Sequence, residues 1–207
     1  MYVSLDDFIN YEKLNDLNNY LNQINIYNFN CVNFVANNKK HGNAIQLTDT
    51  INWDSKFGFR ESRLYRGNPQ YNKLNENSVV LHKLTKFIFD LPFFEHIGCI
   101  CIILNEPNVE GSEHCDHMFD DIVSEFVWIR TENKKRFFVR DNQGEKHYIN
   151  NNCIWFDDHF MHNITPISEK CFSIRIDGKF NDKFRNYIAN QNKFKKSFFK
   201  QFLLNPQ

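Results

Sequence analysis

The sequence contains two clusters of side chains that can bind a metal ion. The first runs Glu113-His114-Cys115-Asp116-His117 and is followed by Asp120 and Asp121; the second runs Asp157-Asp158-His159-Phe160-Met161-His162. The first cluster follows a predicted strand and a glycine turn, and the second follows another predicted strand. Loops and strand ends are where a rigid scaffold presents functional residues. These clusters are therefore the first candidates for a functional site.

His114 and Asp116 are two residues apart, so an extended segment points both side chains the same way. One metal ion can take both, and His162 or His159 can supply a third ligand. Two histidines and one carboxylate on one face of an octahedron form the facial triad of non-haem Fe(II) oxygenases. The three open positions allow a bidentate cosubstrate and O2 to bind side by side. The residues thus predict an iron-dependent oxygenase.

Residues 172–177 alternate as a strand with two different faces. The apolar positions are Phe172, Ile174 and Ile176, and the polar positions are Ser173, Arg175 and Asp177. If the apolar side chains face a hydrophobic shell, Ser173 and Arg175 point into the interior of a barrel. A buried arginine needs an anion, and its planar guanidinium matches a carboxylate with two hydrogen bonds. We expect Arg175 to hold the far carboxylate of a 2-oxo acid; an ion pair with Asp177 or Glu169 is the structural alternative.

The elements around these clusters change character near residue 98. Upstream, residues 4–25 and 78–90 have the apolar spacing of amphipathic helices, the first with Ser4 and Asp7 as a capping box and the second ending before Pro92. Downstream, short apolar runs alternate with turns, which is typical of an antiparallel sandwich or barrel. The predicted strands are Cys99–Leu104, Ile122–Ile129, Arg136–Arg140, Lys146–Ile149, Cys153–Phe156 and Lys170–Ile176, with a hairpin turn at Asp141–Gly144.

The length of 207 residues suits one domain. We expect a mixed helical N-terminal part at 1–97, a β core at 98–178 and a C-terminal helix within 179–207, in which residues 181–203 have helical spacing. Lysine plus arginine (25) equals aspartate plus glutamate (25), and a net charge of zero disfavours nucleic acid or anionic lipid as the main partner. No apolar run approaches the ~18 residues of a membrane span, and the N-terminus lacks the order of a signal peptide, so we expect a cytoplasmic protein.

The six cysteines lack the C-x-x-C spacing of a zinc ribbon or a thioredoxin-type motif. They are Cys31, Cys99, Cys101, Cys115, Cys153 and Cys171. Cys99 and Cys101 are two residues apart in an apolar run, so on a strand they face the same side. We expect buried free thiols rather than disulfides.

The order His114-x-Asp116, a β-rich interval, His162 and then Arg175 resembles the 2-oxoglutarate- and Fe(II)-dependent oxygenases. More narrowly, Trp155-Phe156-Asp157-Asp158-His159-Phe160-Met161-His162 resembles the F-D-D-S-F-x-H signature of the aspartyl/asparaginyl β-hydroxylase family, which includes free-proline hydroxylases. In that signature the last histidine is an iron ligand, which selects His162 over His159. The resemblance covers roughly residues 98–178.

This resemblance implies a mainly β fold with flanking helices and a double-stranded β-helix (jelly-roll) core. It implies Fe(II) held by His114, Asp116 and His162, with 2-oxoglutarate and O2 as cosubstrates and ascorbate supporting activity. The C5 carboxylate of 2-oxoglutarate would lie on Arg175 and Ser173. Because the family arginine usually sits closer to the distal histidine, Lys170 is a second candidate anchor.

We expect a dioxygenase that hydroxylates an unactivated C–H bond of a small polar substrate, such as a free amino acid, or of a peptide residue. A cupin-like metal-binding barrel without oxygenase activity is one alternative, and a nucleic-acid-modifying oxygenase that uses the basic, aromatic tail at 193–200 is another. The arginines at positions 60, 63 and 66 could meet a substrate carboxylate, although solvated loop arginines are the simpler interpretation. Desaturation, ring formation and the oligomeric state stay open.

Overall fold

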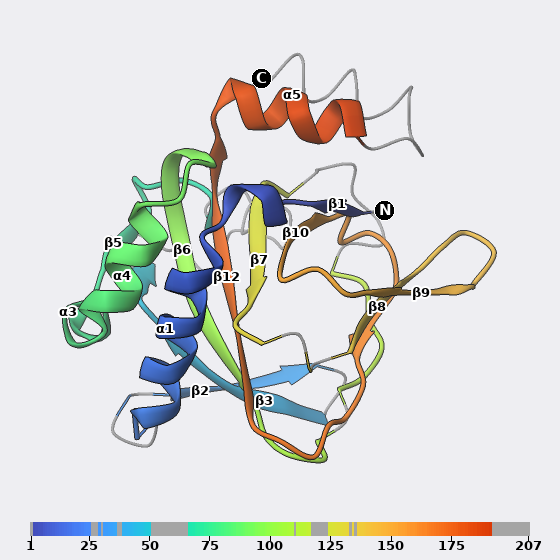
Figure 1. The fold of residues 1–207 in the computed structure, drawn as a ribbon, viewed down its shortest axis with the longest axis horizontal. Helices are drawn as coiled ribbons and strands as arrows, with labels where there is room; N and C mark the ends of the chain where they lie inside the picture. Colours follow the sequence, from blue (N-terminus) through green and yellow to red (C-terminus); the bar gives the residue numbers. More distant parts are fainter. Residues whose placement is uncertain are drawn as a thin grey trace, which may run out of the picture.

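The fold is built around two antiparallel sheets, which Figure 1 shows with helices packed along the outer side of the larger one. The computed structural model describes residues 2–25, 29, 31–36, 39–50, 66–109, 111–116, 124–132, 134 and 136–191. A short third sheet joins β4 (Thr48–Thr50) to β5 (Asn72–Leu74).

The larger sheet has seven strands in the order β1-β10-β7-β12-β6-β3-β2. They span Tyr2–Ser4 (β1), Cys153–Phe156 (β10), Phe126–Arg130 (β7), Cys171–Phe180 (β12), Phe94–Asn105 (β6), Lys39–Gln46 (β3) and Cys31–Ala36 (β2). Every neighbouring pair is antiparallel. The long β6–β12 pair lies at the centre, so β12 is held in register on both sides.

The smaller sheet has the order β11-β8-β9, formed by His162–Ile164, Phe137–Arg140 and Lys146–Ile149. A bridge between His114 and His162 adds the segment around His114 beside β11. From β6 onward the chain forms eight strand segments if the segment around His114 is counted as the second. The larger sheet holds the first, eighth, third and sixth of these (β6, β12, β7 and β10), and the smaller sheet holds the second, seventh, fourth and fifth (the His114 segment, β11, β8 and β9). This interleaving is the jelly-roll topology, so the fold is a double-stranded β-helix with flanking helices, as the resemblance implied.

The main hydrophobic core lies between the larger sheet and the helices. The helices are α1 (Tyr11–Gln23), α3 (Glu76–Val80), α4 (His82–Phe89) and α5 (Asp182–Gln191). They contribute buried side chains that include Leu14, Leu17, Leu21, Leu84, Ile88, Phe184 and Ile188. Phe172, Ile174 and Ile176 of β12 lie in the same core. None of these helices is both long and apolar enough to cross a lipid bilayer.

A second apolar cluster fills the space between the two sheets. Its buried members are Phe126, Trp128, Phe137, Val139, Ile149, Ile154 and Phe156. Because strand side chains alternate, placing Phe172, Ile174 and Ile176 in the outer core turns Ser173, Arg175 and Asp177 towards this interior. The predicted inward direction of Ser173 and Arg175 is therefore confirmed.

Helix boundaries differ from the predicted ones where strands or breaks intervene. The capping box at Ser4 is wrong, because residues 2–4 pair with β10 and α1 begins after Asn10, whose side chain accepts a hydrogen bond from the Lys13 N–H at 3.0 Å. The helix predicted over 78–90 is broken at Leu81 into α3 and α4, and it ends before Pro92 as expected. The C-terminal helix is present through Gln191, and residues 192–207 lie outside the described part of the chain.

Most strands predicted downstream of residue 98 are found, with β6 and β12 longer than expected. The strand predicted over 122–129 is described from Phe126 onward. Two features were not predicted: β11, which has only three residues, and the strands β1–β5 within residues 1–97. The mixed helical description of that N-terminal part was therefore incomplete, because three of its strands, β1, β2 and β3, extend the larger sheet.

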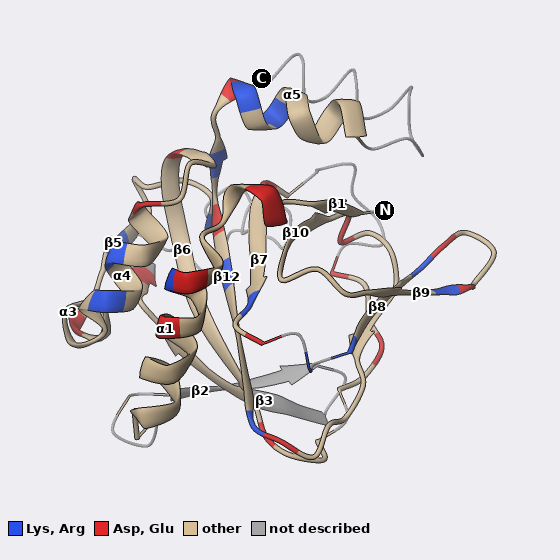
Figure 2. Cartoon of the chain, viewed as in Figure 1, with Lys and Arg blue, Asp and Glu red and all other residues tan. Residues whose placement is uncertain are grey.

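Charged residues are interspersed along the described elements, and basic and acidic positions alternate along β12 (Figure 2). Cys99, Cys101, Cys153 and Cys171 are buried free thiols, as predicted, whereas Cys115 is half-buried.

The β12 side chains of the outer core should dominate stability. Ile174 is fully buried between β12 and the helices, so Ile174→Ala should lower the free energy of unfolding by about 2–5 kcal/mol through lost contacts and an unfilled cavity. Urea denaturation followed by circular dichroism measures the change. Val79→Ala is the matched control, because Val79 is 74% exposed and should change stability by about 0.5 kcal/mol or less. Equal effects of the two substitutions would contradict the assigned core.

Candidate metal centre

The two predicted histidine ligands are joined through their backbones. The N–H of His114 donates to the carbonyl of His162 at 3.1 Å, and the N–H of His162 donates to the carbonyl of His114 at 2.8 Å. This exchange of two hydrogen bonds places both side chains on the same side of the strand pair, with ring centroids 4.6 Å apart. Residues 48 positions apart in the sequence are thus fixed as direct neighbours.

Asp116 is brought to the same point by the second cluster. Its backbone N–H donates to the carbonyl of Asp158 at 3.0 Å, and its Oδ1 lies 3.5 Å from Nε2 of His114. One possible ligand atom from each of His114, Asp116 and His162 lies within 4.8 Å of the others. The structure therefore brings the predicted triad together. His159 is held by Asp157, which its Nδ1 contacts at 2.7 Å.

The hydrogen bonds of the two imidazoles leave the correct nitrogen for a metal. Nδ1 of His114 contacts the carbonyl oxygen of Ser112 at 2.8 Å, and Nδ1 of His162 contacts that of Phe160 at 2.9 Å. A carbonyl oxygen only accepts, so each Nδ1 carries the proton and each Nε2 keeps its lone pair. Metal-binding histidines are usually oriented in this way. The donor set fits a divalent transition metal of the Fe(II) type.

The electrostatics favour the protonation states that a metal requires. Burial alone would raise the pKa of Asp116, but Arg175, His162 and His114 together lower it to about 2. Burial lowers the pKa of His162 despite the attraction of Asp116. Asp116 is thus an anion and His162 a neutral imidazole at neutral pH. Neither ligand has to lose a proton before a metal binds.

Aromatic side chains border the triad on the interior side. The ring of His162 lies 4.9 Å from the ring of Phe156 and 6.0 Å from that of Phe137, between centroids. Phe126 lies under the guanidinium of Arg175, with 4.1 Å between Cζ and the ring centroid. The site therefore has apolar walls, which limit water around any group bound there.

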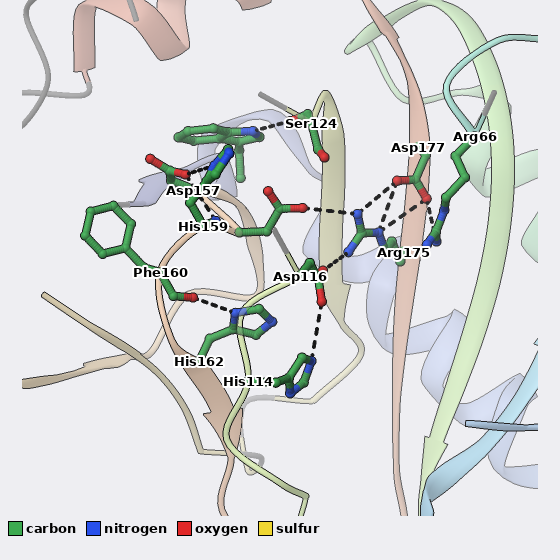
Figure 3. Close-up of polar contacts among 12 residues, drawn as sticks. Arg66, His114, Asp116, Ser124, Asp157, His159, Phe160, His162, Arg175 and Asp177 are labelled. Carbon is green, nitrogen blue, oxygen red and sulfur yellow. Dashed lines mark hydrogen bonds and ion pairs between the residues drawn. The ribbon is translucent and has the colours of Figure 1, made fainter. Parts of the chain in front are cut away.

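Arg175 contacts three carboxylates, as Figure 3 shows. Its Nη1 donates to Oδ2 of Asp116 at 3.0 Å, its Nε donates to Oδ1 of Asp177 at 3.1 Å, and its Nη2 lies 3.5 Å from Oδ2 of Asp158. The ion pair with Asp177, predicted as the alternative role, is present. The anchoring of a cosubstrate by Arg175 stays a prediction.

Of the other cofactor-binding candidates, Ser173 lies on β12 and Lys170 lies just before it. Ser173 is fully buried on the interior face, opposite Arg130 of β7. Lys170 places its Nζ 5.1 Å from the ring centroid of Phe172, a side chain of the outer core. Lys170 is therefore on the side of the sheet away from the triad. Between the two predicted anchors, Arg175 alone faces the interior.

Several contacts around the triad were not predicted. Glu113, next to His114, forms a salt bridge with Arg140 of β8. Arg66, considered as a contact for a substrate carboxylate, instead donates to Asp177 at 3.1 Å. The alternation of charge along 173–177 was a signal for a buried network, but the pairing of Arg66 with β12 has no sequence signature. His117, the arginines at 60 and 63, and the tail at 193–200 lie outside the described residues.

Comparison with known proteins gives similarity at the level of structure. No protein-family model matches the sequence, and no curated protein does. Similar solved structures include a Pseudomonas putida prolyl-4-hydroxylase (10% identity, 87% of this chain and 91% of that chain, TM-score 0.49). They also include a prolyl hydroxylase from Trichoplax adhaerens (11% identity, 90% of this chain and 86% of that chain, TM-score 0.48). A third is a viral collagen prolyl hydroxylase from Paramecium Bursaria Chlorella virus-1 (9% identity, 85% of this chain and 94% of that chain, TM-score 0.41). The narrower resemblance to the aspartyl/asparaginyl β-hydroxylases stays a prediction.

The buried state of His162 predicts an unusual titration in metal-free protein. Its imidazole should titrate below the ordinary pKa of 6.5, because burial disfavours the charged form. As pH falls below about 6.5, the imidazole of His162 takes up a proton in the unfolded chain before it does so in the folded protein. The free energy of unfolding should therefore decrease as pH falls through this range. Proton NMR of the imidazole measures the midpoint. Asp116→Asn should lower the titration midpoint of His162 further, because Asp116 attracts the protonated ring. A midpoint above 6.5 in the wild-type protein would contradict the buried environment assigned to His162.

Proposed function

We propose that this protein is an Fe(II)- and 2-oxoglutarate-dependent oxygenase that hydroxylates an unactivated C–H bond. The observation that carries the proposal is the convergence of two imidazoles and one carboxylate, with one possible ligand atom from each within 4.8 Å of the others, between the sheets of a jelly roll. Three protein ligands of this type leave open positions on a six-coordinate metal, as cosubstrate and O2 binding require. The weak structural similarities described above are compatible with this function but do not carry it.

Each residue of the triad has a defined task in this proposal. His114 and His162 hold the iron through Nε2, and Asp116 holds it through one carboxylate oxygen. The bound iron and 2-oxoglutarate would supply the activation of O2, which no protein side chain can perform. The protein orients the ligands through the backbone bridge and the Nδ1 hydrogen bonds. Phe126, Phe137 and Phe156 limit water at the site.

We propose a small polar substrate, such as a free amino acid, or a residue within a peptide. A net charge of zero and the mixed charges of the described elements give no strong field that would attract nucleic acid. Ascorbate would support activity by keeping the iron reduced. The C5 carboxylate of 2-oxoglutarate needs a cation. The resemblance implies Arg175 with Ser173 for this task, but the three carboxylates around Arg175 would oppose a further anion there.

Succinate release from 2-oxoglutarate tests the proposed reaction. Purified protein with Fe(II) and ascorbate should release succinate, and His162→Ala should abolish release because the metal loses a ligand. His147→Ala is the matched control: His147 lies on β9, is 44% exposed, and pairs with Asp141, so activity should be unchanged. Because turnover without the prime substrate can be slow, anaerobic binding of 2-oxoglutarate to the Fe(II)-loaded protein is measured in parallel. Metal binding without 2-oxoglutarate binding would favour a cupin-like metal-binding barrel.

The class of substrate can be tested in the same assay. Addition of the correct free amino acid should accelerate succinate release and yield a product heavier by one oxygen atom, detected by mass spectrometry. If no free amino acid is modified although 2-oxoglutarate is turned over, the small-substrate proposal is wrong and peptides become the next class to screen. A product lighter by two hydrogen atoms would indicate desaturation or ring formation instead of hydroxylation.

A further inference from the structure

A chain of alternating charges leads from the surface of the molecule to the proposed metal ligand Asp116. Arg66 pairs with Asp177, Asp177 with Arg175, and Arg175 with Asp116, at 3.1, 3.1 and 3.0 Å. Figure 3 shows these four side chains in line beside the triad. The side chain of Arg66 is 42% exposed, whereas those of Asp177 and Arg175 are 6% and 13% exposed. The inner contacts are therefore largely shielded from solvent.

The last contact of this chain distinguishes the two oxygens of Asp116. Oδ2 accepts a hydrogen bond from Nη1 of Arg175, whereas Oδ1 lies beside Nε2 of His114. A carboxylate with one oxygen bound to a guanidinium presents the other oxygen to a metal in a fixed direction. Arg175 therefore orients the ligand.

Each nitrogen of the Arg175 guanidinium has at least one carboxylate partner within the protein. Nε and Nη2 face Asp177, Nη2 also lies near Asp158, and Nη1 faces Asp116. A cosubstrate carboxylate at Arg175 would share this guanidinium with three carboxylates of the protein, whose negative charge would oppose it. In addition, a cation in direct contact with a metal ligand lies at the metal end of a chelated 2-oxo acid, whereas the far carboxylate lies at the opposite end of the molecule.

Three glycines determine how closely Arg66 approaches β12. A Cβ at Gly98 would lie 2.1 Å from the carbonyl oxygen of Arg66, and a Cβ at Gly67 would lie 2.9 Å from the carbonyl oxygen of Gly178. Both distances are shorter than any side chain tolerates. Residues 66–67 therefore pack directly on the backbones of β6 and β12. This close packing brings the Arg66 guanidinium to Asp177.

We propose that Arg175 is a positioning residue for the metal ligand Asp116, rather than the anchor of the cosubstrate, and that Asp177 and Arg66 hold Arg175 in place. The proposal rests on the proposed function in one respect: it takes Asp116 to be a metal ligand. Groups that orient ligands in this way commonly change metal affinity by 10- to 100-fold when they are altered. The two roles of Arg175 therefore differ in a measurable property, the affinity for the metal alone.

The test measures Co(II) binding to metal-free protein without 2-oxoglutarate, by calorimetry and by the visible absorption of bound Co(II). Arg175→Lys keeps the positive charge but loses the planar fork, so it should weaken Co(II) binding by roughly 10- to 100-fold. The absorption bands should also change, because the orientation of Asp116 is altered. Arg185→Lys is the matched control. Arg185 is 5% exposed and pairs with Glu125 at the C-terminal end of β12, where it also donates to the carbonyl of Phe180, so Co(II) affinity should be unchanged.

A second variant changes Arg66, at the outer end of the chain of charges. It keeps the inference testable if Arg175→Lys fails to fold. Arg66→Met keeps the aliphatic stem of a partly exposed side chain and removes the charge together with the hydrogen bond to Asp177. It should weaken Co(II) binding by less than Arg175→Lys. The two changes together should weaken binding by less than the product of the single effects, because Arg66 reaches Asp116 only through Asp177 and Arg175.

The outcomes separate the inference from the proposed function. If the wild-type protein binds neither Co(II) nor Fe(II), the proposed function fails. If it binds Co(II) and Arg175→Lys binds equally well but has lost affinity for 2-oxoglutarate, Arg175 is the cosubstrate anchor and the inference is overturned. Equal Co(II) affinity in wild type, Arg175→Lys and Arg66→Met overturns it as well. A selective loss in Arg175→Lys, with Arg185→Lys unchanged, supports it.

Discussion

The backbone bridge between His114 and His162 is the constraint on which the site depends. Two hydrogen bonds fix the segment after β6 against β11, and the side-chain direction at both positions follows from that register. A shift by one residue would turn one imidazole away from the other. The Nδ1 contacts with Ser112 and Phe160 then set the rotation of each ring. The bonds that hold these strands together thus also define the direction of both Nε2 atoms.

The buried carboxylates near the triad are stabilised by direct contact with arginine side chains, although carboxylates outnumber arginines there. Asp116, Asp158 and Asp177 all contact Arg175, and Arg66 supplies a second cation at the outer end. Burial alone would lower the pKa of Arg175, but its attraction to these carboxylates raises it. Removing one partner from such a buried group usually costs more than the pair contributes, because the remaining charge is left without compensation. The inner face of β12 therefore tolerates polar residues only as a connected set.

Local signals in the sequence were sufficient to predict an antiparallel β core and the pairing of His114 with Asp116, whereas the jelly-roll fold and the third member of the triad were implied by the family resemblance. Alternation along β12 indicated which side chains point inward, and the spacing of His114 and Asp116 indicated a shared ligand direction. The signature ending in His162 selected it over His159. The strands β1–β3 were not predicted, since they gain stability from pairing with distant strands rather than from their own pattern. The contact of Arg66 with Asp177 likewise depends on tertiary packing at Gly67, Gly98 and Gly178, which has no local signature.

The bridge between the two histidine strands also bears on the order of events during maturation. In small zinc domains the ion itself assembles the ligands, so apo chains are unfolded. Here hydrogen bonds within the polypeptide already hold two imidazoles side by side, and a hydrophobic core on each face of the larger sheet supports them. In the proposed oxygenase, iron would therefore bind late and reversibly to a protein that is already folded. Iron would add to thermal resistance only through mass action, in proportion to the logarithm of its free concentration.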